Sequence, residues 1–394
     1  MRILALIGSR PLPPIAGPAI RFAYLWPHVA HGQDVELKVL GLDIPSIPTT
    51  EPARFPGLDA EFLSFGPRGF ANRVIGRFSR SWHEYPYCPE LAQRVDELIE
   101  SFRPDVIHAD EFRMAAYLPS VRGRPSTGIQ SVTFHNVETD LFAKLVSPAV
   151  PWPLKGLASR LQVRSLKQFE NRVAHAVSLR FAYSDLDRQR YSSLYPDLAW
   201  KTTRNGVNAS DIQPAPQVAK PSVFLLGRWS YGPNMMGLRW LLDEVRPHLD
   251  PALEFVVAGS GASETIKTWV SQAGWTFHDT PLDLSPFYAE AAVVAVPVLE
   301  GSGTRGKILE ALAHERMVVT TTKGPEGLNL GADSGIVIAD EPRQFAQKLA
   351  EVATSSPESR AEAAHQGRQA VLAHYDWSVV ASELLEAWNS CISP

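Results

Sequence analysis

The sequence predicts an α/β protein made of two doubly wound, Rossmann-like domains, and three observations support this prediction. The chain has 394 residues, a length typical of two domains. Short apolar runs rich in Val, Ile and Leu recur in both halves, as expected for parallel strands that are buried on both faces. Amphipathic stretches separate these runs, which indicates βαβ units with right-handed crossovers.

Ten apolar runs are candidate strands. Those of the first half are Ile3–Gly8, Val35–Leu40, Asp105–His108, Gln130–Phe134 and Leu179–Tyr183. Those of the second half are Val223–Gly227, Leu253–Gly259, Thr276–His278, Val293–Val298 and Met317–Thr322. The first run is too short for a secretory leader, and none approaches the roughly 20 apolar residues that span a bilayer. We therefore expect a cytoplasmic protein that is at most peripheral at the inner face of the membrane.

A turn and a proline-spaced stretch separate the two halves. Asn205-Gly206 is a turn dipeptide, and Pro214-Ala215-Pro216 has the composition of a linker. We expect a first domain over residues 1–214, a second over 215–375 and a terminal segment over 376–394. Open α/β sheets bind ligands beyond the carboxyl ends of their strands, so two such domains predict a site in a cleft that both face.

Composition excludes several classes of protein. Hydrophobic residues make up 45% and charged residues 20%, a globular balance that argues against disorder. The formal net charge of −4 predicts no nucleic-acid partner. The two cysteines, Cys88 and Cys391, have no metal-ligand spacing and predict a reducing compartment. Asp185-Leu186-Asp187 could hold a metal ion, but Ser184 and Asp187 form a capping box, and we interpret the string as a helix cap. We expect no metal and no permanently bound cofactor.

A glycine-rich turn joins the run Val293–Val298 to a strong helix former over residues 307–313. The turn reads Gly301, Ser302, Gly303, Thr304, Arg305, Gly306 and Lys307. A helix that follows such a turn presents unpaired backbone N–H groups and the positive end of its dipole. Two cations at that end are unfavourable unless an anion binds there, so the turn predicts an anion site.

Three templates compete for this turn. It fits G-x-x-x-x-G-K, although Ile308 stands where a P-loop has Ser or Thr. It also fits the dinucleotide fingerprint G-x-G-x-x-G, with Glu326 at the distance of a ribose contact, but that motif normally occupies the first βα turn of a domain. In the third template the turn holds the diphosphate of a sugar nucleotide, and Glu310, one turn into the helix, holds the ribose.

Several segments resemble the retaining glycosyltransferases with the GT-B fold, family four or group one. The most specific is Val298–Ala313 with Val318-Val319-Thr320 and Glu326-Gly327-Leu328. Three further segments are similar: Leu225–Arg228 with Gly232-Pro233-Asn234, Asn205-Gly206-Val207, and Thr133–Glu138. The resemblance implies a metal-independent transfer of a sugar, with retention, from a nucleoside diphosphate sugar to a hydroxyl of a glycan, glycolipid or lipid-linked acceptor. It also implies that the last helix returns to the first domain.

The resemblance assigns roles to particular residues. It implies that His135, Arg228 and Lys307 are catalytic. Donor binding would involve Gly17, Arg228, Gly301, Ser302, Gly303, Thr304, Arg305, Lys307 and Glu310, and the acceptor side would involve Arg21 and Asn136. The chain departs from the family at Ser302, where many members carry a glutamate that contacts the sugar, and it lacks the usual lysine after Arg228. Lys307 is therefore expected to be the main ammonium on the phosphates.

Two further observations remain open. Residues 68–82 interleave Arg68, Arg73, Arg77 and Arg80 with apolar side chains, a pattern compatible with a membrane surface or a solvated helix edge. The alternatives to a transferase are a sugar-nucleotide epimerase on the same fold, a non-catalytic nucleotide-sugar-binding subunit, and an NAD-dependent dehydrogenase.

Overall fold

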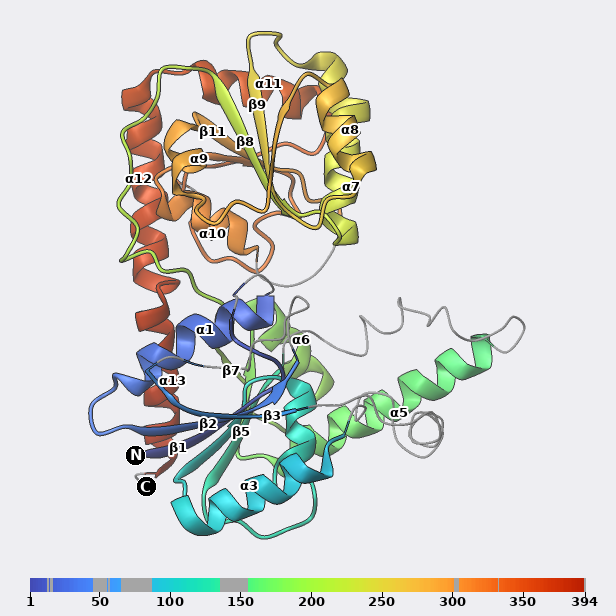
Figure 1. Cartoon of the computed structure of the whole chain (residues 1–394), viewed down its shortest axis with the longest axis vertical. Helices are drawn as coiled ribbons and strands as arrows, with labels where there is room; N and C mark the ends of the chain where they lie inside the picture. The colour runs from blue at the N-terminus through green and yellow to red at the C-terminus, as the bar shows by residue number, and fades with distance from the viewer. Residues whose placement is uncertain are drawn as a thin grey trace. The chain divides into compact units, whose positions relative to one another are not determined.

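The computed structural model of the chain describes residues 1–12, 14, 17–44, 55, 57–64, 87–134, 155–300, 305–331 and 333–392. It divides into two compact units. Unit 1 comprises residues 1–204 and 380–394, and unit 2 comprises residues 205–379. Each unit is a parallel sheet with helices on both faces (Figure 1). This is the α/β architecture that the alternation of apolar runs and amphipathic stretches predicts.

Unit 1 holds a parallel sheet in the order β3-β2-β1-β4-β5-β6-β7. Its strands are β1 (Arg2–Ile7), β2 (Glu36–Asp43), β3 (Asp59–Ser64), β4 (Val106–Ala109), β5 (Ile129–Phe134), β6 (Leu179–Ala182) and β7 (Lys201–Thr202). All five strands predicted in this half are confirmed. The sequence prediction missed the two edge strands, β3 and β7. β3 reads DAEFLS and β7 has two residues, so neither carries the continuous apolar run of a strand buried on both faces.

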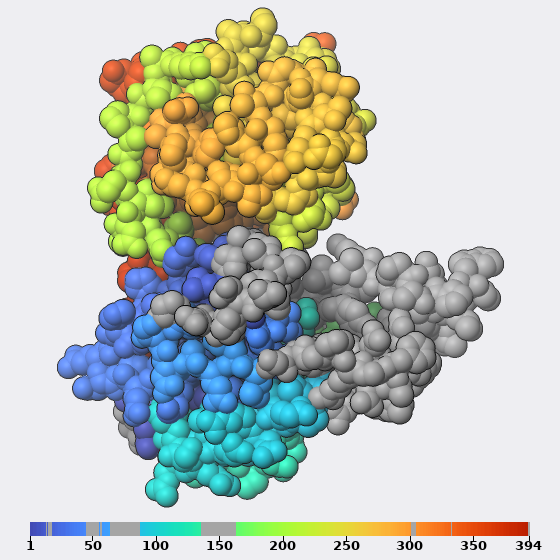
Figure 2. Space-filling model, in the orientation of Figure 1, coloured from blue at the N-terminus to red at the C-terminus, as the bar shows by residue number. Residues whose placement is uncertain are grey.

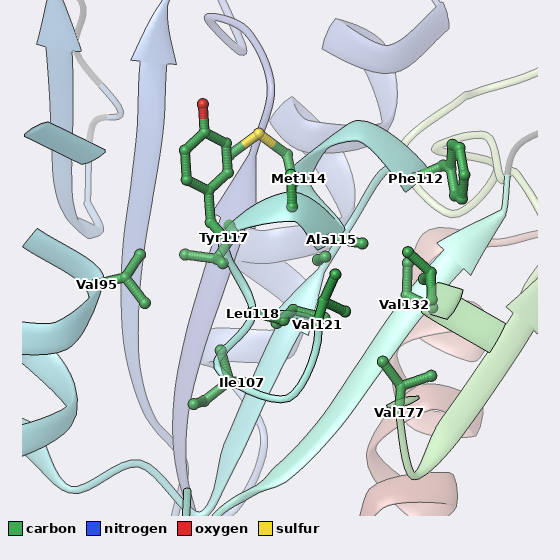
Figure 3. Packing of buried hydrophobic residues seen from close by; sticks show 14 of the residues in the cluster. Val95, Ile107, Phe112, Met114, Ala115, Tyr117, Leu118, Val121, Val132 and Val177 are labelled. Atoms are coloured by element: carbon green, nitrogen blue, oxygen red, sulfur yellow. The ribbon is translucent and has the colours of Figure 1, made fainter. Parts of the chain in front are cut away.

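The helices of unit 1 cover both faces of this sheet (Figure 1). They are α1 (Gly17–Ala30), α3 (Pro89–Phe102), η2 (Phe112–Tyr117), α5 (Lys155–Ala176), α6 (Asp185–Leu194) and the C-terminal α13 (Trp377–Ile392). Side chains of α3, η2 and the central strands form one hydrophobic core. Figure 3 shows Val95, Ile107, Leu118 and Val132 converging from these elements.

The helix α13 completes the core of unit 1, as the family resemblance implies. Trp388 is fully buried, stacks on Trp26 with 6.4 Å between ring centroids, and donates from Nε1 to Ser131 Oγ at 3.0 Å. Ser131 also bonds the ring of His108 at 2.8 Å. The last helix of the chain is therefore bound to the first half through both ring packing and a buried polar network.

The D-x-D string caps α6, as predicted. Ser184 Oγ accepts from the backbone N–H of Asp187 at 3.0 Å, and the two side chains bond at 2.7 Å. Asp185 instead accepts from Thr202 and pairs with Arg204, which lowers its pKa although burial acts in the opposite direction. Both carboxylates thus have structural partners within unit 1.

Unit 2 holds a second parallel sheet, in the order β10-β9-β8-β11-β12-β13. Its strands are β8 (Ser222–Arg228), β9 (Glu254–Ser260), β10 (Thr276–Asp279), β11 (Val293–Val296), β12 (Val318–Thr320) and β13 (Ile336–Ile338). The five predicted strands are confirmed, and the sequence prediction missed β13, an edge strand of three residues. The α-helices of unit 2 are α7 (Gly232–Trp240), α8 (Glu264–Gln272), α9 (Ser285–Glu290), α10 (Gly306–Ala313), α11 (Pro342–Thr354) and α12 (Pro357–His374). The short helical turns η3 (Leu241–Val245) and η4 (Arg246–His248) follow α7.

The proline-spaced stretch expected to be a linker is bound to unit 2. Arg316 is fully buried, and one of its terminal nitrogens donates to the carbonyls of Ala215 and Pro216, each at 3.0 Å. Arg368 donates to Ile212 O at 2.9 Å, and Arg360 donates to Val218 O. The compact units accordingly divide between residues 204 and 205, ten residues before the boundary that the prolines suggested.

None of the described helices combines the length and the apolar character that a membrane span requires. Cys88 is buried and Cys391 is exposed, and neither forms a disulfide. On the face of unit 1 shown in Figure 2, the surface passes from the blue N-terminal residues to the cyan of α3.

Candidate donor and acceptor sites

The sheet order of unit 2 locates its ligand-binding edge. β9 lies beside β8 on one side of the sheet, and β11 lies beside β8 on the opposite side. The connections that follow β8 and β11 therefore run in opposite directions along the sheet. Ligands of open α/β sheets bind at such a switch point, beyond the carboxyl ends of the strands. Arg228 is the last residue of β8, and α10 begins at Gly306, ten residues after β11 ends at Val296, with Arg305 at its N-cap.

Lys307 lies in the first turn of α10 and is partly buried. Its ammonium donates to Asn234 Oδ1 at 2.8 Å. Among the described residues, no carboxylate lies within ion-pair distance of Lys307. Burial lowers the pKa of Lys307 to about 8, and the neighbouring guanidinium of Arg305 acts in the same direction. The result is an ammonium whose partner in unit 2 is neutral.

Asn234 joins this ammonium to the end of β8. It lies in the first turn of α7, and its Nδ2 donates to the backbone carbonyl of Arg228 at 3.0 Å. The Arg228 side chain is exposed, and its Nε donates to Ser230 Oγ at 3.3 Å. Asn234 was not predicted as a site residue, although the segment Gly232-Pro233-Asn234 was part of the resemblance.

Arg305 is a third cation at this edge. It occupies the N-cap position of α10 and is partly buried. Burial lowers its pKa, while the Tyr231 hydroxyl and the Glu326 carboxylate raise it to a smaller extent. Glu326 itself pairs with Lys323 at 2.8 Å. The two sequence-predicted cations of the turn therefore both lie at the start of α10.

Neither α7 nor α10 receives a side-chain cap from the described residues, and the same holds for α9 and α11 of this unit. The helix α7 packs closely on the chain leaving β11, because a Cβ atom on Gly237 would lie 1.9 Å from the Pro297 carbonyl oxygen. The positive ends of the α7 and α10 dipoles, together with the three cations, suit an anion.

Glu310 follows Lys307 by three residues on α10, and it is partly buried. Burial raises the pKa of its carboxyl to about 7, although the Tyr288 hydroxyl lowers it to a smaller extent. Tyr288 is fully buried and stacks on His314 with 4.3 Å between ring centroids. Near neutral pH, Glu310 is therefore divided between its charged and neutral forms.

Unit 1 has its own switch point, between β1 and β4, and it contains a carboxylate that sequence reasoning missed. Glu111 is the second residue after β4, and Gly8 directly follows β1. A Cβ atom on Gly8 would lie 1.8 Å from Glu111 Oε1, so the carboxylate occupies the space that the missing side chain leaves. Burial raises the pKa of Glu111. The signal available in the sequence was a pair of acidic residues, Asp110 and Glu111, at the end of a central strand.

Arg21 does not lie where the acceptor-side prediction placed it. Its side chain is fully buried in unit 1, where Nε donates to Asp110 Oδ1 at 2.8 Å. The terminal nitrogens donate to Arg204 O at 2.9 Å and Thr203 Oγ1 at 3.1 Å, and the guanidinium lies over the ring of Tyr183. With its donors directed at these partners, Arg21 connects α1 to the far end of the sheet.

Several predicted site residues lie outside the described residues. They are His135, Asn136, Gly301, Ser302, Gly303 and Thr304, together with the basic stretch 68–82. Gly17 is described as the first residue of α1. The structure thus brings Arg228, Arg305, Lys307 and Glu310 together in unit 2.

A cavity of about 680 Å³ lies elsewhere in unit 1, and none of the predicted site residues lines it. Its walls come from α3, from the chain after η2 and from α5. They include the cluster in which Arg122 and Arg124 both pair with Asp96, and the ring of Phe169. Asp96 thus pairs with two of the arginines that line the cavity, and the predicted site residues lie instead at the strand ends of the sheets.

Comparison with known sequences finds a family match within the second half of the chain. Residues 220–355 match the family model described as "Glycosyl transferases group 1". A curated relative, an uncharacterized 44.6 kDa protein in the cps region of Klebsiella pneumoniae, is 28% identical over 139 residues. That match covers 32% of this chain and about a third, 36%, of the relative's length.

Solved structures match the whole chain at low identity. Sucrose-phosphate synthase from Thermosynechococcus elongatus is 14% identical with a TM-score of 0.69, and the match covers 100% of both chains. A glycosyltransferase from Rickettsia africae has a TM-score of 0.68 at 14% identity, with 100% of this chain and 98% of the other covered. HepE from Anabaena, solved with UDP and glucose, has a TM-score of 0.67 at 14% identity over 99% and 100% of the chains. These matches establish the fold.

Proposed function

We propose that this chain, which has the GT-B fold and whose residues 220–355 match the glycosyl transferases group 1, moves a sugar from a nucleoside diphosphate sugar to a hydroxyl of a glycan, glycolipid or lipid-linked acceptor. The observation that carries the proposal is the ammonium of Lys307, bonded to a neutral amide beside Arg228 at the switch point of unit 2. A cation that is partly buried and has no counterion among the described residues is suited to a phosphate group.

The donor diphosphate binds at the start of α10 in this proposal. Lys307 and Arg228 contact its oxygens, and Arg305 adds charge at the helix N-terminus. The segment from Gly301 to Thr304, with Gly17 of the first βα loop, completes the donor site. Preorganised cations stabilise the charge that develops on the leaving diphosphate and account for several kcal/mol of many enzymes' catalysis. HepE was solved with UDP, and the fold it shares with this chain supports such a donor.

Glu310 binds the ribose hydroxyls through its carboxylate. The ionised carboxylate can accept a hydrogen bond from each of the two hydroxyls, whereas the neutral carboxyl carries a proton and must itself donate a hydrogen bond. The Tyr288 hydroxyl favours the ionised form. This assigns the nucleoside and the diphosphate to consecutive turns of one helix.

The acceptor side belongs to unit 1. His135 and Asn136 remain our candidates near the transferred sugar, with His135 catalytic. We add Glu111, because a partly buried carboxyl with a raised pKa at a strand-end switch point is typical of a functional site. We leave out Arg21, whose buried contacts are structural.

The stereochemistry and the setting follow the family. We propose retention at the anomeric carbon, with the leaving phosphate accepting the acceptor's proton, and no requirement for a metal ion, since the D-x-D carboxylates are engaged in a cap and ion pairs. We propose a role in polysaccharide biosynthesis in the cytoplasm, with residues 68–82 contacting the inner face of the membrane. The cps-region relative supports this setting.

Two rivals share the fold. An epimerase acting on a sugar nucleotide would place additional carboxylates near the sugar, and Ser302 stands where the family often has one. A non-catalytic subunit would bind the donor without turning it over. Slow hydrolysis of a donor sugar nucleotide by the isolated protein distinguishes a transferase from both.

The test is a thermal-shift panel of UDP, GDP, ADP, CDP, dTDP and NAD. A ligand present at 100 times its dissociation constant stabilises the folded protein by about 2.7 kcal/mol. We expect one diphosphate to raise the melting temperature clearly above the others. Stabilisation by NAD alone, or by none of the diphosphates at millimolar concentration, would refute the proposal.

A further inference from the structure

We propose that Asn234 is a positioning residue for the donor diphosphate: its amide holds the Lys307 ammonium at the end of β8 without neutralising it. The inference rests on the proposed function, because it assigns a partner to the ammonium of the same site. It explains how Lys307 can serve in place of the lysine that the family usually carries shortly after the arginine matching Arg228.

The two hydrogen bonds of Asn234 fix which way its amide points. Nδ2 donates to the Arg228 carbonyl at 3.0 Å, and this acceptor can pair only with the NH₂ end of the amide. The oxygen must therefore face Lys307, whose Nζ donates to it at 2.8 Å. The orientation is determined by the chemistry of both partners, so the ammonium is held in one place.

The helix that carries Asn234 is also fixed. It starts four residues after β8 ends, and Gly237, one turn beyond Asn234, packs against Pro297 so closely that a Cβ atom would lie 1.9 Å from the carbonyl oxygen. The contact anchors α7 to the chain leaving β11. Asn234 is therefore held between the ends of β8 and β11, the two strands that flank the switch point.

The neutrality of the amide matters as much as its position. A carboxylate at residue 234 would pair with Lys307 and cancel its charge before a diphosphate arrives. An amide accepts the same hydrogen bond while leaving the full positive charge to an incoming anion. The neighbouring charge that lowers the pKa of Lys307 belongs to Arg305, the N-cap residue of α10, and this positive charge also favours a bound anion.

The decisive variant is Asn234→Asp, with Asn234→Ala as its partner and Asn389→Asp as the control. The aspartate keeps the size and the acceptor for Lys307, adds a charge and loses the donor to the Arg228 carbonyl, whereas the alanine loses both hydrogen bonds and adds no charge. Asn389 is exposed on α13, so its change adds the same charge elsewhere. Binding of the diphosphate selected by the panel, and of its nucleoside without phosphates, is measured by titration calorimetry.

We expect Asn234→Asp to weaken diphosphate binding at pH 7 by about tenfold or more, while nucleoside binding changes by less than twofold. Asn234→Ala should weaken it by about threefold, and the control should match the wild type. Equal diphosphate affinity in wild type and Asn234→Asp, or an equal loss of nucleoside affinity, would overturn the inference.

A second measurement needs no ligand, so it separates this inference from the proposed function. The rate at which an acylating reagent modifies Lys307 is followed against pH by mass spectrometry of the free protein. We expect the midpoint to rise in Asn234→Asp, where a carboxylate faces the ammonium, and to stay near the wild-type value in the control. An unchanged midpoint in Asn234→Asp overturns the inference even if the wild type binds a diphosphate. If no diphosphate binds, the proposed function fails and the midpoints alone decide whether Asn234 sets the charge of Lys307.

Discussion

Replacing Lys307 by methionine should stabilise the folded protein while it abolishes most of the activity. The ammonium is partly buried with a neutral partner, and burial lowers its pKa from 10.5 to about 8. This difference corresponds to roughly 3 kcal/mol that the folded state loses by keeping the charge at neutral pH. Methionine removes that cost but leaves Asn234 Oδ1 without its donor, which costs about 1–2 kcal/mol. We expect a net gain of about 1–2 kcal/mol.

The sign of the pH dependence follows from the same pKa. Between about pH 8 and pH 10.5 the unfolded chain holds a proton at Lys307 that the folded protein has released, so the stability of the wild type rises with pH. The advantage of Lys307→Met is therefore complete at pH 7 and disappears as the pH rises through this window. Urea unfolding at pH 7 and pH 9.5, followed by circular dichroism, measures it.

Lys267 provides the matched control. It lies in the same unit and pairs with Glu264 at 3.0 Å and Asp279 at 2.8 Å, which raise its pKa. Lys267→Met should change the stability only slightly, because exposed ion pairs contribute little. In the transfer assay, Lys307→Met should lower kcat/KM by about 30- to 1,000-fold, equivalent to about 2–4 kcal/mol. A destabilised Lys307→Met at pH 7, or an equal difference at both pH values, would refute the reasoning.

Two further predictions concern α10 and the segment before β8. Because the pKa of Glu310 is about 7, the affinity of the wild type for the diphosphate should fall as the pH drops below 7. Glu310→Gln should bind at least about tenfold more weakly, and its affinity should not depend on pH in this way. Calorimetry between pH 5.5 and 8 checks both expectations. A wild-type affinity that stays constant over this range would contradict the role of the carboxylate. Arg316→Lys should destabilise the protein by about 3 kcal/mol or more, because one ammonium cannot reach the carbonyls that the guanidinium bonds. The exposed Arg343→Lys is the control for urea unfolding, and equal stability of the two variants would show that the buried contacts contribute little.

Central strands could be predicted from the sequence, and edge strands could not. A strand such as β11 is buried on both faces and reads as an uninterrupted apolar run. β3 and β7 lie at the edges of their sheet and are partly exposed, so polar residues are tolerated and the pattern disappears. The capping box at Ser184 was predictable because its partners are three residues apart.

Contacts between distant residues account for what the sequence did not reveal. The composition of Pro214-Ala215-Pro216 suggested a free linker, but Arg316 lies about a hundred residues further on and binds that backbone. The family resemblance led us to expect Arg21 on the acceptor side, whereas its ion-pair partner Asp110 is 89 residues away in the sequence. Lys307 and Glu310 could be proposed from the sequence because both lie on the helix that follows the glycine-rich turn. Asn234 could not be assigned, since its role depends on two partners from separate elements.

The contribution of α13 to unit 1 has a consequence for the order in which the protein folds during synthesis. Residues 205–379 form a contiguous unit that can close its core as soon as it has left the ribosome. Unit 1 begins with the first residue, yet Trp388 belongs to its core, where it packs on Trp26 and bonds Ser131. The half that is made first therefore has to wait for the last residues of the chain. Until they emerge, Trp26 lacks its packing partner, and transiently exposed apolar surface of this kind favours aggregation.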